Sequence, residues 1–348
     1  MTTIRILSLC LLIFIGLLLP ACMHAQQNAA AHMADKPLFR DPVYDGAADP
    51  VVIWNRKQQQ WFMFYTNRRA NVKKARGVTW VHGTRIGIAV SKNGASWQYL
   101  DTAHIDHRPD SGYTYWAPEV IEHEGLYHMY LTYVPGTFTN WNHPRSIIHL
   151  ISSDLLNWKY VSTLDLANDQ VIDACVFRLP GGGWRMWYNN EKDHKSFYYA
   201  DSPDLYHWQD KGPAIRHRPG EMSGEGPKVF RWKDRYWMIV DNWAGLGVYS
   251  SADLLHWQRQ QERLLEHPGQ GADDQAIGGH ADVVVNDGRA YLFYFTHPGR
   301  AKAHPAPDTT VAWRRSVIQL AELKYQDGRI TCNRDEPVKI KLIPPGSE

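Results

Sequence analysis

This sequence contains few cysteines and has a net charge close to zero. Its 348 residues include only 4 cysteines, which lack the spacing of a metal site and are too few for a disulfide scaffold. Lys and Arg total 38 and Asp and Glu total 36, a net charge of +2, which excludes the basic footprint of a nucleic-acid-binding protein. A content of 44% hydrophobic and 21% charged residues is typical of a folded protein and excludes a disordered one.

Two missing patterns narrow the fold and the chemistry. Beyond the N-terminal segment, no stretch of about twelve positions repeats apolar residues at i, i+3 and i+4, which argues against an α/β fold. The Gly-x-Ser-x-Gly elbow of one common hydrolase class is absent. Glycines 181–183 are not followed by a helical pattern, so they predict a tight turn rather than a phosphate-binding loop.

The N-terminus predicts an exported protein. Arg5 precedes an apolar run over residues 6–20, which is typical of a secretory signal and too short for a membrane span. Residues 19–22 (LPAC) resemble the bacterial lipobox, so we expect residues 1–21 to be removed as a signal peptide and Cys22 to carry lipid. Ordinary cleavage near Ala25 is the alternative. We therefore expect a lipoprotein of the bacterial cell envelope, whose only membrane contact is this lipid anchor. A periplasmic or secreted protein is the alternative.

The rest of the chain divides into a tether and one domain. Residues 22–36 are rich in Ala, Gln and His without periodicity and predict a tether. Residues 37–348 are expected to form a single folded domain and to act as a monomer. Within it, Cys175 lies in an apolar run (VIDACVF) and predicts a buried thiol, while a disulfide with Cys332 is left open.

A short motif, Ser-x-Asp-Leu-x-x-Trp, recurs along the chain. It ends at Trp158, Trp208 and Trp257, and a looser copy ends at Trp97. Each copy follows β-prone residues, and its Ser and Asp supply the side-chain to backbone hydrogen bonds that turns use. The motif therefore predicts the same turn between two strands in successive repeats.

A second repeat gives the architecture. Five aromatic, β-branched segments each follow a short apolar run, and these runs begin at Asp49, Trp116, Asp173, Glu225 and His280. From those residues to Trp61, Tyr127, Trp184, Tyr236 and Tyr291 the count is 12, 11, 11, 11 and 11. Four-stranded units repeated in this way predict an all-β fold, a single-domain five-bladed β-propeller. An open sandwich, the competing fold, gives no reason for five matched registers.

The matched register predicts a site. The first strand of each propeller blade lines the central channel, so the five residues that begin these runs should converge at one end of it. Three of them are carboxylic acids, and crowded like charges oppose folding unless they are used or compensated. Sugar hydrolysis needs two carboxyl groups, one protonated and one ionised, and a third acid can raise the pKa of the proton donor.

Other residues are candidates for binding sugar. Indole faces stack on sugar rings, and the tryptophans expected near the cavity mouth are Trp80, Trp116, Trp141, Trp187 and Trp243. The long segment 68–82, with Arg68, Trp80 and His82, is expected to cover part of the cavity. Arg300 is expected either to grip a sugar hydroxyl or carboxylate or to lie in a solvated loop.

These residues resemble glycoside hydrolase family 43. The resemblance rests on Asp49 in AADPVV, WAPEV from Trp116, Asp173 in VIDACVF, Glu225 in SGEGPKVF and GGHADV around His280, in that order. It implies an inverting enzyme in which Asp49 is the general base, Glu225 the general acid, and Asp173 orients the acid and raises its pKa. It also implies that His280 lies low in the channel, where such a residue often holds a water shell around a calcium ion. No cofactor is required, and a structural calcium is optional.

The resemblance leaves the substrate open. An oligo- or polysaccharide of plant type, cleaved as by an arabinofuranosidase or xylosidase, is the expected substrate. Related propeller glycosidases act on galactose, fructose or anhydrogalactose, and a non-catalytic carbohydrate-binding propeller is the alternative from another class. Phosphorolysis would need a basic cluster at the cavity, for which the sequence offers only scattered residues. Ala174 and Cys175 depart from the family's usual Pro or Ser, and Glu225 is preferred over Glu221 because Gly-Pro follows it.

Overall fold

The computed structural model describes residues 30–107, 112–301 and 306–346. The predicted signal peptide and Cys22 lie outside these ranges. In the described part of the chain, no helix has the length and apolar character needed to span a membrane. The short helical segments are η1 (Thr79–Val81), η2 (Pro298–Arg300) and α1 (Val311–Arg314).

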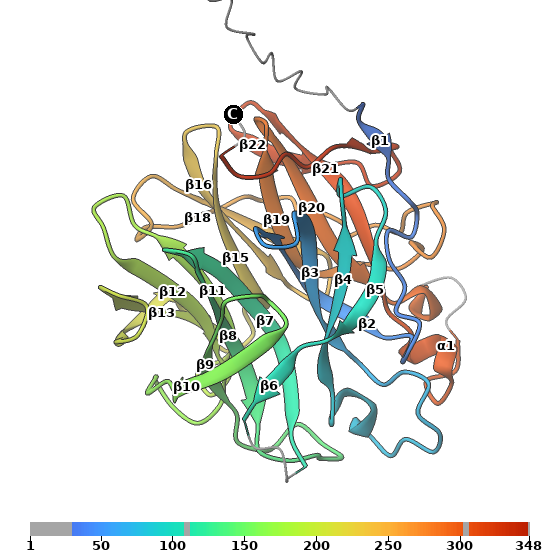
Figure 1. Ribbon diagram of the computed structural model, residues 1–348, viewed down its shortest axis with the longest axis horizontal. Helices are drawn as coiled ribbons and strands as arrows, with labels where there is room; N and C mark the ends of the chain where they lie inside the picture. The colour runs from blue at the N-terminus through green and yellow to red at the C-terminus, as the bar shows by residue number, and fades with distance from the viewer. Residues whose placement is uncertain (1–29, 108–111, 302–305, 347–348) are drawn as a thin grey trace, which may run out of the picture. The chain divides into compact units, whose positions relative to one another are not determined.

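Five antiparallel sheets confirm the predicted five-bladed propeller, and Figure 1 shows the chain passing from one to the next. Blade one is β2 (Ala47–Asn55), β3 (Gln60–Asn67), β4 (Arg85–Ser91) and β5 (Gln98–Thr102). Blade two is β7 (Thr114–His123), β8 (Leu126–Val134), β9 (Ser146–Ser152) and β10 (Asn157–Thr163), with β6 (His104–Asp106) added in parallel to β10. Blade three is β11 (Val171–Arg178), β12 (Trp184–Asn190), β13 (Ser196–Ser202) and β14 (Gln209–Ile215). Blade four is β15 (Glu225–Trp232), β16 (Arg235–Asp241), β17 (Leu246–Ser251) and β18 (Gln258–Arg259). Blade five is β19 (Gly278–Asn286), β20 (Arg289–Thr296), β21 (Val317–Gln326) and β22 (Arg329–Cys332).

The core lies between neighbouring blades, which explains the near-continuous apolar runs of the second strands. Successive side chains of a strand point to opposite faces, so β3 sends Trp61 and Met63 toward blade five and Phe62 and Phe64 toward blade two. Both faces of the blade are therefore buried, and neither needs polar side chains. Apolar burial of this kind contributes roughly 25 cal/mol per Å² to folding.

Hydrogen bonds between blades fix the ring. Thr66 Oγ1 accepts from the Ala117 N–H at 2.8 Å, and Thr132 Oγ1 accepts from the Asp173 N–H at 3.1 Å. The ring closes where β19 packs on β2 and Asp282 Oδ2 accepts from the Val52 N–H at 2.8 Å. These bonds hold the inner strands in one register, so residues from different blades reach the channel at the same level.

A buried ion cluster fills the channel. Lys228 Nζ lies 2.9 Å from Glu119 Oε2 and 2.9 Å from Asp282 Oδ1, so one cation bridges acids from two other blades. Burial raises the pKa of Glu119, while the charges of Asp282 and Glu119 help keep the pKa of Lys228 well above its usual value, against the effect of burial. The cluster places fixed charge at the centre of the fold, away from the apolar layers between blades.

The repeated motif forms the predicted turn. Ser152 Oγ accepts from the Leu155 N–H at 2.9 Å, and Asp154 Oδ1 accepts from the Leu156 and Asn157 N–H groups at 2.8 Å each. Leucines at the fourth position, Leu155, Leu205 and Leu254, have φ of 65°, 70° and 65°. The Ser and Asp oxygens accept hydrogen bonds that stabilise the positive φ of this leucine, which explains why the same residues recur in each turn.

The structure changes the expectation for the tether and answers the question of the disulfide. His32–Met33 (β1) pairs with Lys339–Ile340 (β23), and Lys36 Nζ lies 3.2 Å from Asp274, so this part of the predicted tether is attached to the propeller. Backbone hydrogen bonds to β23 hold this segment, although its sequence shows no strand-like alternation. Cys175 is buried as predicted, and Cys175 and Cys332 are both free thiols. The disulfide left open by the sequence is not formed.

Candidate functional site

A β-bulge near the start of the inner strand gives four blades the same local geometry. Its first residue has a positive φ in each case: Asp49 (53°), Ala117 (44°), Asp173 (59°) and Gly226 (58°). Bulges re-aim side chains next to active sites. The expected register is therefore corrected by one residue in two blades, because Trp116 and Glu225 precede the bulge position that Asp49 and Asp173 occupy.

Glycine at position 226 follows from its surroundings. A Cβ there would lie 2.5 Å from the His280 ring, and the positive φ also disfavours other residues. The Glu-Gly-Pro motif thus lets β15 and β19 approach closely while Glu225 enters the cavity.

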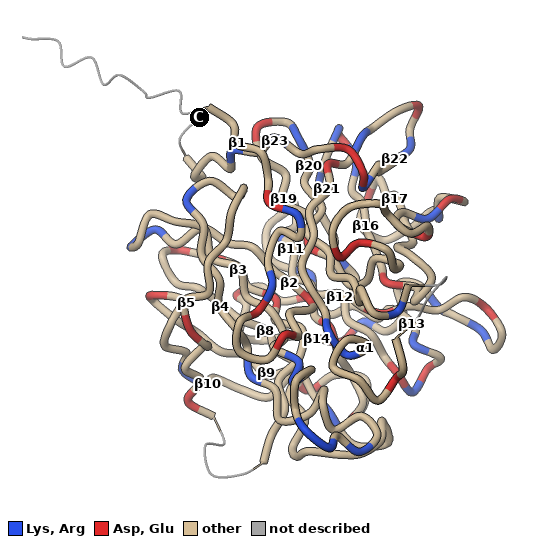
Figure 2. The backbone as a smooth tube through the Cα atoms, turned by 90° about the vertical axis from the view of Figure 1, so that its right-hand side faces the viewer, with Lys and Arg blue, Asp and Glu red and all other residues tan. Residues whose placement is uncertain are grey.

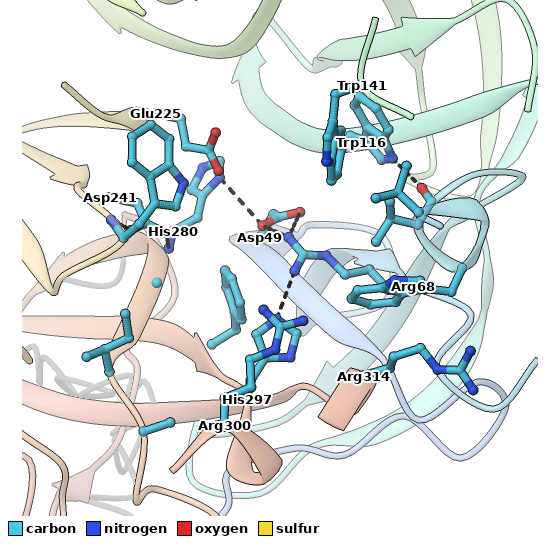
Figure 3. Close-up of a pocket in the computed structure, with 18 of the residues that line it drawn as sticks. Asp49, Arg68, Trp116, Trp141, Glu225, Asp241, His280, His297, Arg300 and Arg314 are labelled. Carbon is cyan, nitrogen blue, oxygen red and sulfur yellow. Dashed lines mark hydrogen bonds and ion pairs between the residues drawn. The ribbon is translucent and has the colours of Figure 1, made fainter. Parts of the chain in front are cut away.

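The three predicted acids lie together. A cavity of about 1120 Å³ is lined by Asp49, Asp173 and Glu225, which come from β2, β11 and β15. Trp80, Trp116, Trp243, His280 and Arg300 also line it, and Figure 3 shows Asp49 between His280 and Arg68. The convergence expected from the matched register is therefore found.

Asp49 is held by an arginine. Arg68 Nη2 donates to both carboxylate oxygens, at 3.0 and 3.3 Å, and His280 Nδ1 lies 3.6 Å from Oδ1. Arg68 also donates to His297 Nε2 at 3.2 Å, while His297 Nδ1 donates to the Arg315 carbonyl at 2.7 Å. Burial holds the pKa of His297 well below its usual value, so it is a neutral acceptor for Arg68.

Asp173 is buried to the same extent as Asp49, each with 6% of its surface exposed. Its side chain accepts from the Gly226 N–H at 2.9 Å, which ties it to the residue beside Glu225. Burial, and then the charges of Glu225 and Asp49, raise its pKa well above the usual value. The three acids are therefore close enough to influence one another electrostatically.

The Glu225 carboxylate lies next to the ammonium group of Lys195. Lys195 Nζ lies 3.4 Å from Glu225 Oε2 and donates to Glu191 at 2.5 Å, and it sits 5.2 Å from the centre of the Trp243 ring. Arg145 pairs with Glu191 on the other side. The Glu225 side chain is 27% exposed against 7% for Asp49, so it is open to a ligand in the cavity.

The family can now be stated from the sequence model that matches the chain. The model of glycosyl hydrolases family 43 matches residues 39–312, which include all five inner strands. The chain belongs to glycoside hydrolase family 43. It is an enzyme that hydrolyses glycosidic bonds.

Solved structures of family 43 enzymes share its fold. A thermostable family-43 glycoside hydrolase has a TM-score of 0.64 and 18% identity, with 89% of this chain and 100% of that chain covered. A β-xylosidase/α-arabinofuranosidase from a compost microbial metagenome, in a calcium-free complex with xylotriose, has a TM-score of 0.59 and 15% identity, covering 92% and 99%. A β-1,3-galactosidase with galactodeoxynojirimycin has a TM-score of 0.60 and 14% identity, covering 87% and 98%. Among curated proteins, none matches the chain.

The family 43 cavity is also lined by acids that the sequence reasoning missed, namely Glu191, Asp241, Glu266 and Asp308. Asp241, at the end of β16, accepts from the His280 N–H at 2.9 Å and the Trp243 N–H at 2.7 Å. Burial first, and then the charge of Glu225, raise the pKa of Asp241 to about 7. The register could have revealed it, because equivalent positions of the other blades carry Thr66, Thr132, Asn189 and Thr296.

Aromatic side chains form two walls of the cavity. Trp116 donates its indole N–H to the Val81 carbonyl at 2.6 Å and lies 6.0 Å from the exposed Trp141. Trp80 and Trp313 meet edge to face at 6.4 Å on the side formed by η1 and α1. Segment 68–82 therefore contributes Arg68 and Trp80 to the cavity, as its length suggested.

Two predicted ligand contacts are wrong. Trp187 is fully buried against Trp257 in the core between blades three and four and does not line the cavity. His82 is also buried, because it packs behind Trp116 at 5.2 Å and bonds His143 at 3.0 Å. Burial lowers the pKa of His82 to about 4, so it is neutral and supports the wall. Glu221 is exposed and is not among the residues that line the cavity.

The donor set around His280 does not favour a metal held by protein side chains. Within the described ranges, no group of three or more His, Cys, Asp or Glu side chains is arranged to hold a metal ion. Calcium prefers oxygen ligands, and the acid that meets the His280 ring, Asp49, is engaged by Arg68. Calcium held through water at His280 stays a prediction, and no catalytic step below uses it.

Proposed function

We propose that this enzyme removes a pentose, arabinofuranose or xylose, from plant-type oligo- or polysaccharide fragments by single displacement with inversion. The observation that carries the proposal is the convergence of Asp49, Asp173 and Glu225 from three blades into one cavity with tryptophan walls. A relative described as a β-xylosidase/α-arabinofuranosidase supports the choice of sugar.

Each acid has surroundings that suit one role. Arg68 positions Asp49 with two hydrogen bonds, and a general base must be held in position. Glu225 is the more exposed acid, as a proton donor to a bulky leaving group must be. Asp173 is bonded to the backbone next to Glu225 and adds a negative charge that opposes loss of the donor's proton.

The reaction then needs one water molecule. Asp49 removes a proton from that water as its oxygen attacks the anomeric carbon from one face of the sugar. Glu225 gives its proton to the glycosidic oxygen as the bond on the other face breaks. Attack opposite to the leaving group inverts the anomeric centre.

Activity of the purified full chain on nitrophenyl glycosides and plant oligosaccharides tests the reaction. We expect Asp49→Asn and Glu225→Gln each to lose several orders of magnitude in kcat while remaining folded. Glu221→Gln is the matched control, because Glu221 is an exposed acid only four residues from Glu225. Near-normal rates in both cavity variants would reject the roles, and tight glycan binding without product would favour a binding propeller.

NMR of the first products tests the stereochemistry. Accumulation of the inverted anomer before mutarotation is expected. Initial accumulation of the retained anomer would contradict single displacement, because it requires a covalent intermediate on the enzyme.

We also propose that the protein is exported, carries lipid at Cys22 and acts as a monomer. Mass spectrometry of the protein recovered from the cell envelope should detect a lipid-modified N-terminal Cys22. Cys22→Ala should release the protein from the membrane fraction, and size-exclusion chromatography should give the mass of one chain. Both charge signs are interspersed along the described chain (Figure 2), which fits a glycan partner better than nucleic acid.

A further inference from the structure

Arg300 occupies a defined place at the edge of the cavity. It ends η2, directly after β20, and lines the cavity together with Arg68 and His297. Figure 3 shows Arg300 beside His297, where Arg68 reaches Asp49. The sequence left open whether Arg300 grips a ligand or lies in a solvated loop, and its place in the cavity wall favours a ligand.

Contacts with tryptophan fix the guanidinium. It lies 3.7 Å from the centre of the Trp313 ring and 5.7 Å from that of Trp80, and its Nε donates to the Trp313 carbonyl at 3.1 Å. Stacking on an aromatic face restricts the side chain before any ligand arrives. The two terminal Nη groups have no hydrogen-bond partner among the described residues and remain as a pair of parallel donors.

The charge of Arg300 has no acidic partner in the described part of the chain. Asp49 is occupied by Arg68, and Arg145 and Lys195 share Glu191 elsewhere in the cavity. Burial, and then the positive charge of Arg68, lower the pKa of Arg300 to about 9, so it still carries its charge at neutral pH. A partly buried cation beside a second cation is costly unless a ligand brings negative charge.

We infer that Arg300 binds the carboxylate of a uronic acid, so that the natural substrate is an acidic glycan. This inference rests on the proposed glycosidase function and names its substrate class. The two Nη groups match the two oxygens of a carboxylate, which is the geometry in which arginine is most selective. Trp313, a partly exposed residue of the cavity wall next to the guanidinium, offers apolar surface to the same sugar ring.

A binding measurement that needs no turnover tests the inference. Calorimetric titration of the full chain at low ionic strength compares glucuronate and galacturonate with glucose and galactose. We expect at least one uronate to bind about ten-fold or more tightly than its neutral counterpart, because hydrogen bonds between two charged groups are stronger than those to a neutral group. Arg300→Gln should abolish that ratio, and Arg300→Lys should keep only part of it because the fork is lost.

Controls separate this site from a general charge effect. Arg231→Gln changes the net charge equally at a surface position that is 64% exposed, and it should preserve the uronate preference. Inorganic phosphate and sulfate are titrated in parallel, and equal affinity for these ions and for uronate would overturn the assignment. So would equal binding of uronate and neutral sugar by the wild type, or a preference that survives in Arg300→Gln. Failure of the proposed function is distinct, since it appears as no product from neutral and acidic glycosides alike while the uronate preference persists.

Discussion

Glu225 and Asp241 are cross-strand partners at the cavity end of blade four. They face each other on β15 and β16, and Asp241 in turn accepts from the backbone N–H of His280 on the next blade. The charge of Glu225 adds to burial in raising the pKa of Asp241 to about 7. Asp241 therefore keeps its proton to near neutral pH, which gives blade four a property that the Thr and Asn of the other blades cannot supply.

Asp241 should make stability depend on pH. In the unfolded chain an aspartate ionises near 3.9, whereas in the fold Asp241 keeps its proton to about 7. Between these values the folded state binds more protons, so its free energy of unfolding falls as pH rises, by at most about 4 kcal/mol from this group. Asp241→Asn removes that dependence, and the melting temperature of the wild type relative to the variant should fall between pH 5 and pH 8.

The matched control is Asp234→Asn, at a side chain that is 99% exposed. Its melting curve should follow that of the wild type across the same range. Parallel pH dependence in wild type and Asp241→Asn would contradict the raised pKa of Asp241.

Lys228 should be essential to the stability of the channel. Lys228→Met leaves Glu119 and Asp282 buried without a counterion, and breaking a buried ion pair in this way costs about 3–5 kcal/mol. Chemical denaturation should show that loss at pH 7 and a smaller one at pH 5, since lower pH can protonate Glu119, whose pKa burial already raises. Lys324→Met, at a pair that is half exposed, should cost no more than about 1 kcal/mol. Equal losses in the two variants would show that the channel cluster is not a buried ion network.

Trp243 and Trp187 should differ although the sequence predicted the same role for both. Trp243 is 45% exposed in the cavity, so Trp243→Ala should raise KM and leave the free energy of unfolding nearly unchanged. Trp187 is fully buried, so Trp187→Ala should lower that free energy by about 3–5 kcal/mol. Steady-state kinetics and urea denaturation of both variants measure the contrast. A rise in KM for a still stable Trp187→Ala would restore the original interpretation.

The contrast between these two tryptophans marks the limit of sequence reasoning. The blades were predictable because strand alternation and turn motifs are local, and the ring forces the inner strands into matched register. Trp187 was not assignable because both faces of β12 are buried, so alternation cannot say which side chain meets the cavity. Arg68 and Lys195 reach the acids from segments between strands, where no periodicity sets direction.

Loop length explains the remaining error in register. The loop between the first two strands is longer in blades one and three (residues 56–59 and 179–183) than in blades two and four (124–125 and 233–234). Equal counts along the sequence therefore placed Trp116 and Glu225 one position away from the residues equivalent to Asp49. Asp241 lay within reach of the same counting, because it is the one acid at a position that holds Thr or Asn in the other four blades. Matched register singled out the three acids at the start of the inner strands, whereas Asp241 lies at the end of a second strand.

Asp173 should affect both the rate of the reaction and the pH range of activity. Its raised pKa means that it ionises at higher pH than an ordinary aspartate, and once ionised it opposes release of the proton from Glu225. Asp173→Asn keeps an acceptor for the Gly226 N–H but removes this charge. We therefore expect kcat to fall by about 10²-fold or more, and the alkaline limb of the kcat/KM profile to move to lower pH. A role in folding alone would scale the profile without moving it, so an unshifted limb would reject this role. Asp101→Asn, at a side chain that is 50% exposed on β5, should leave both the rate and the profile unchanged.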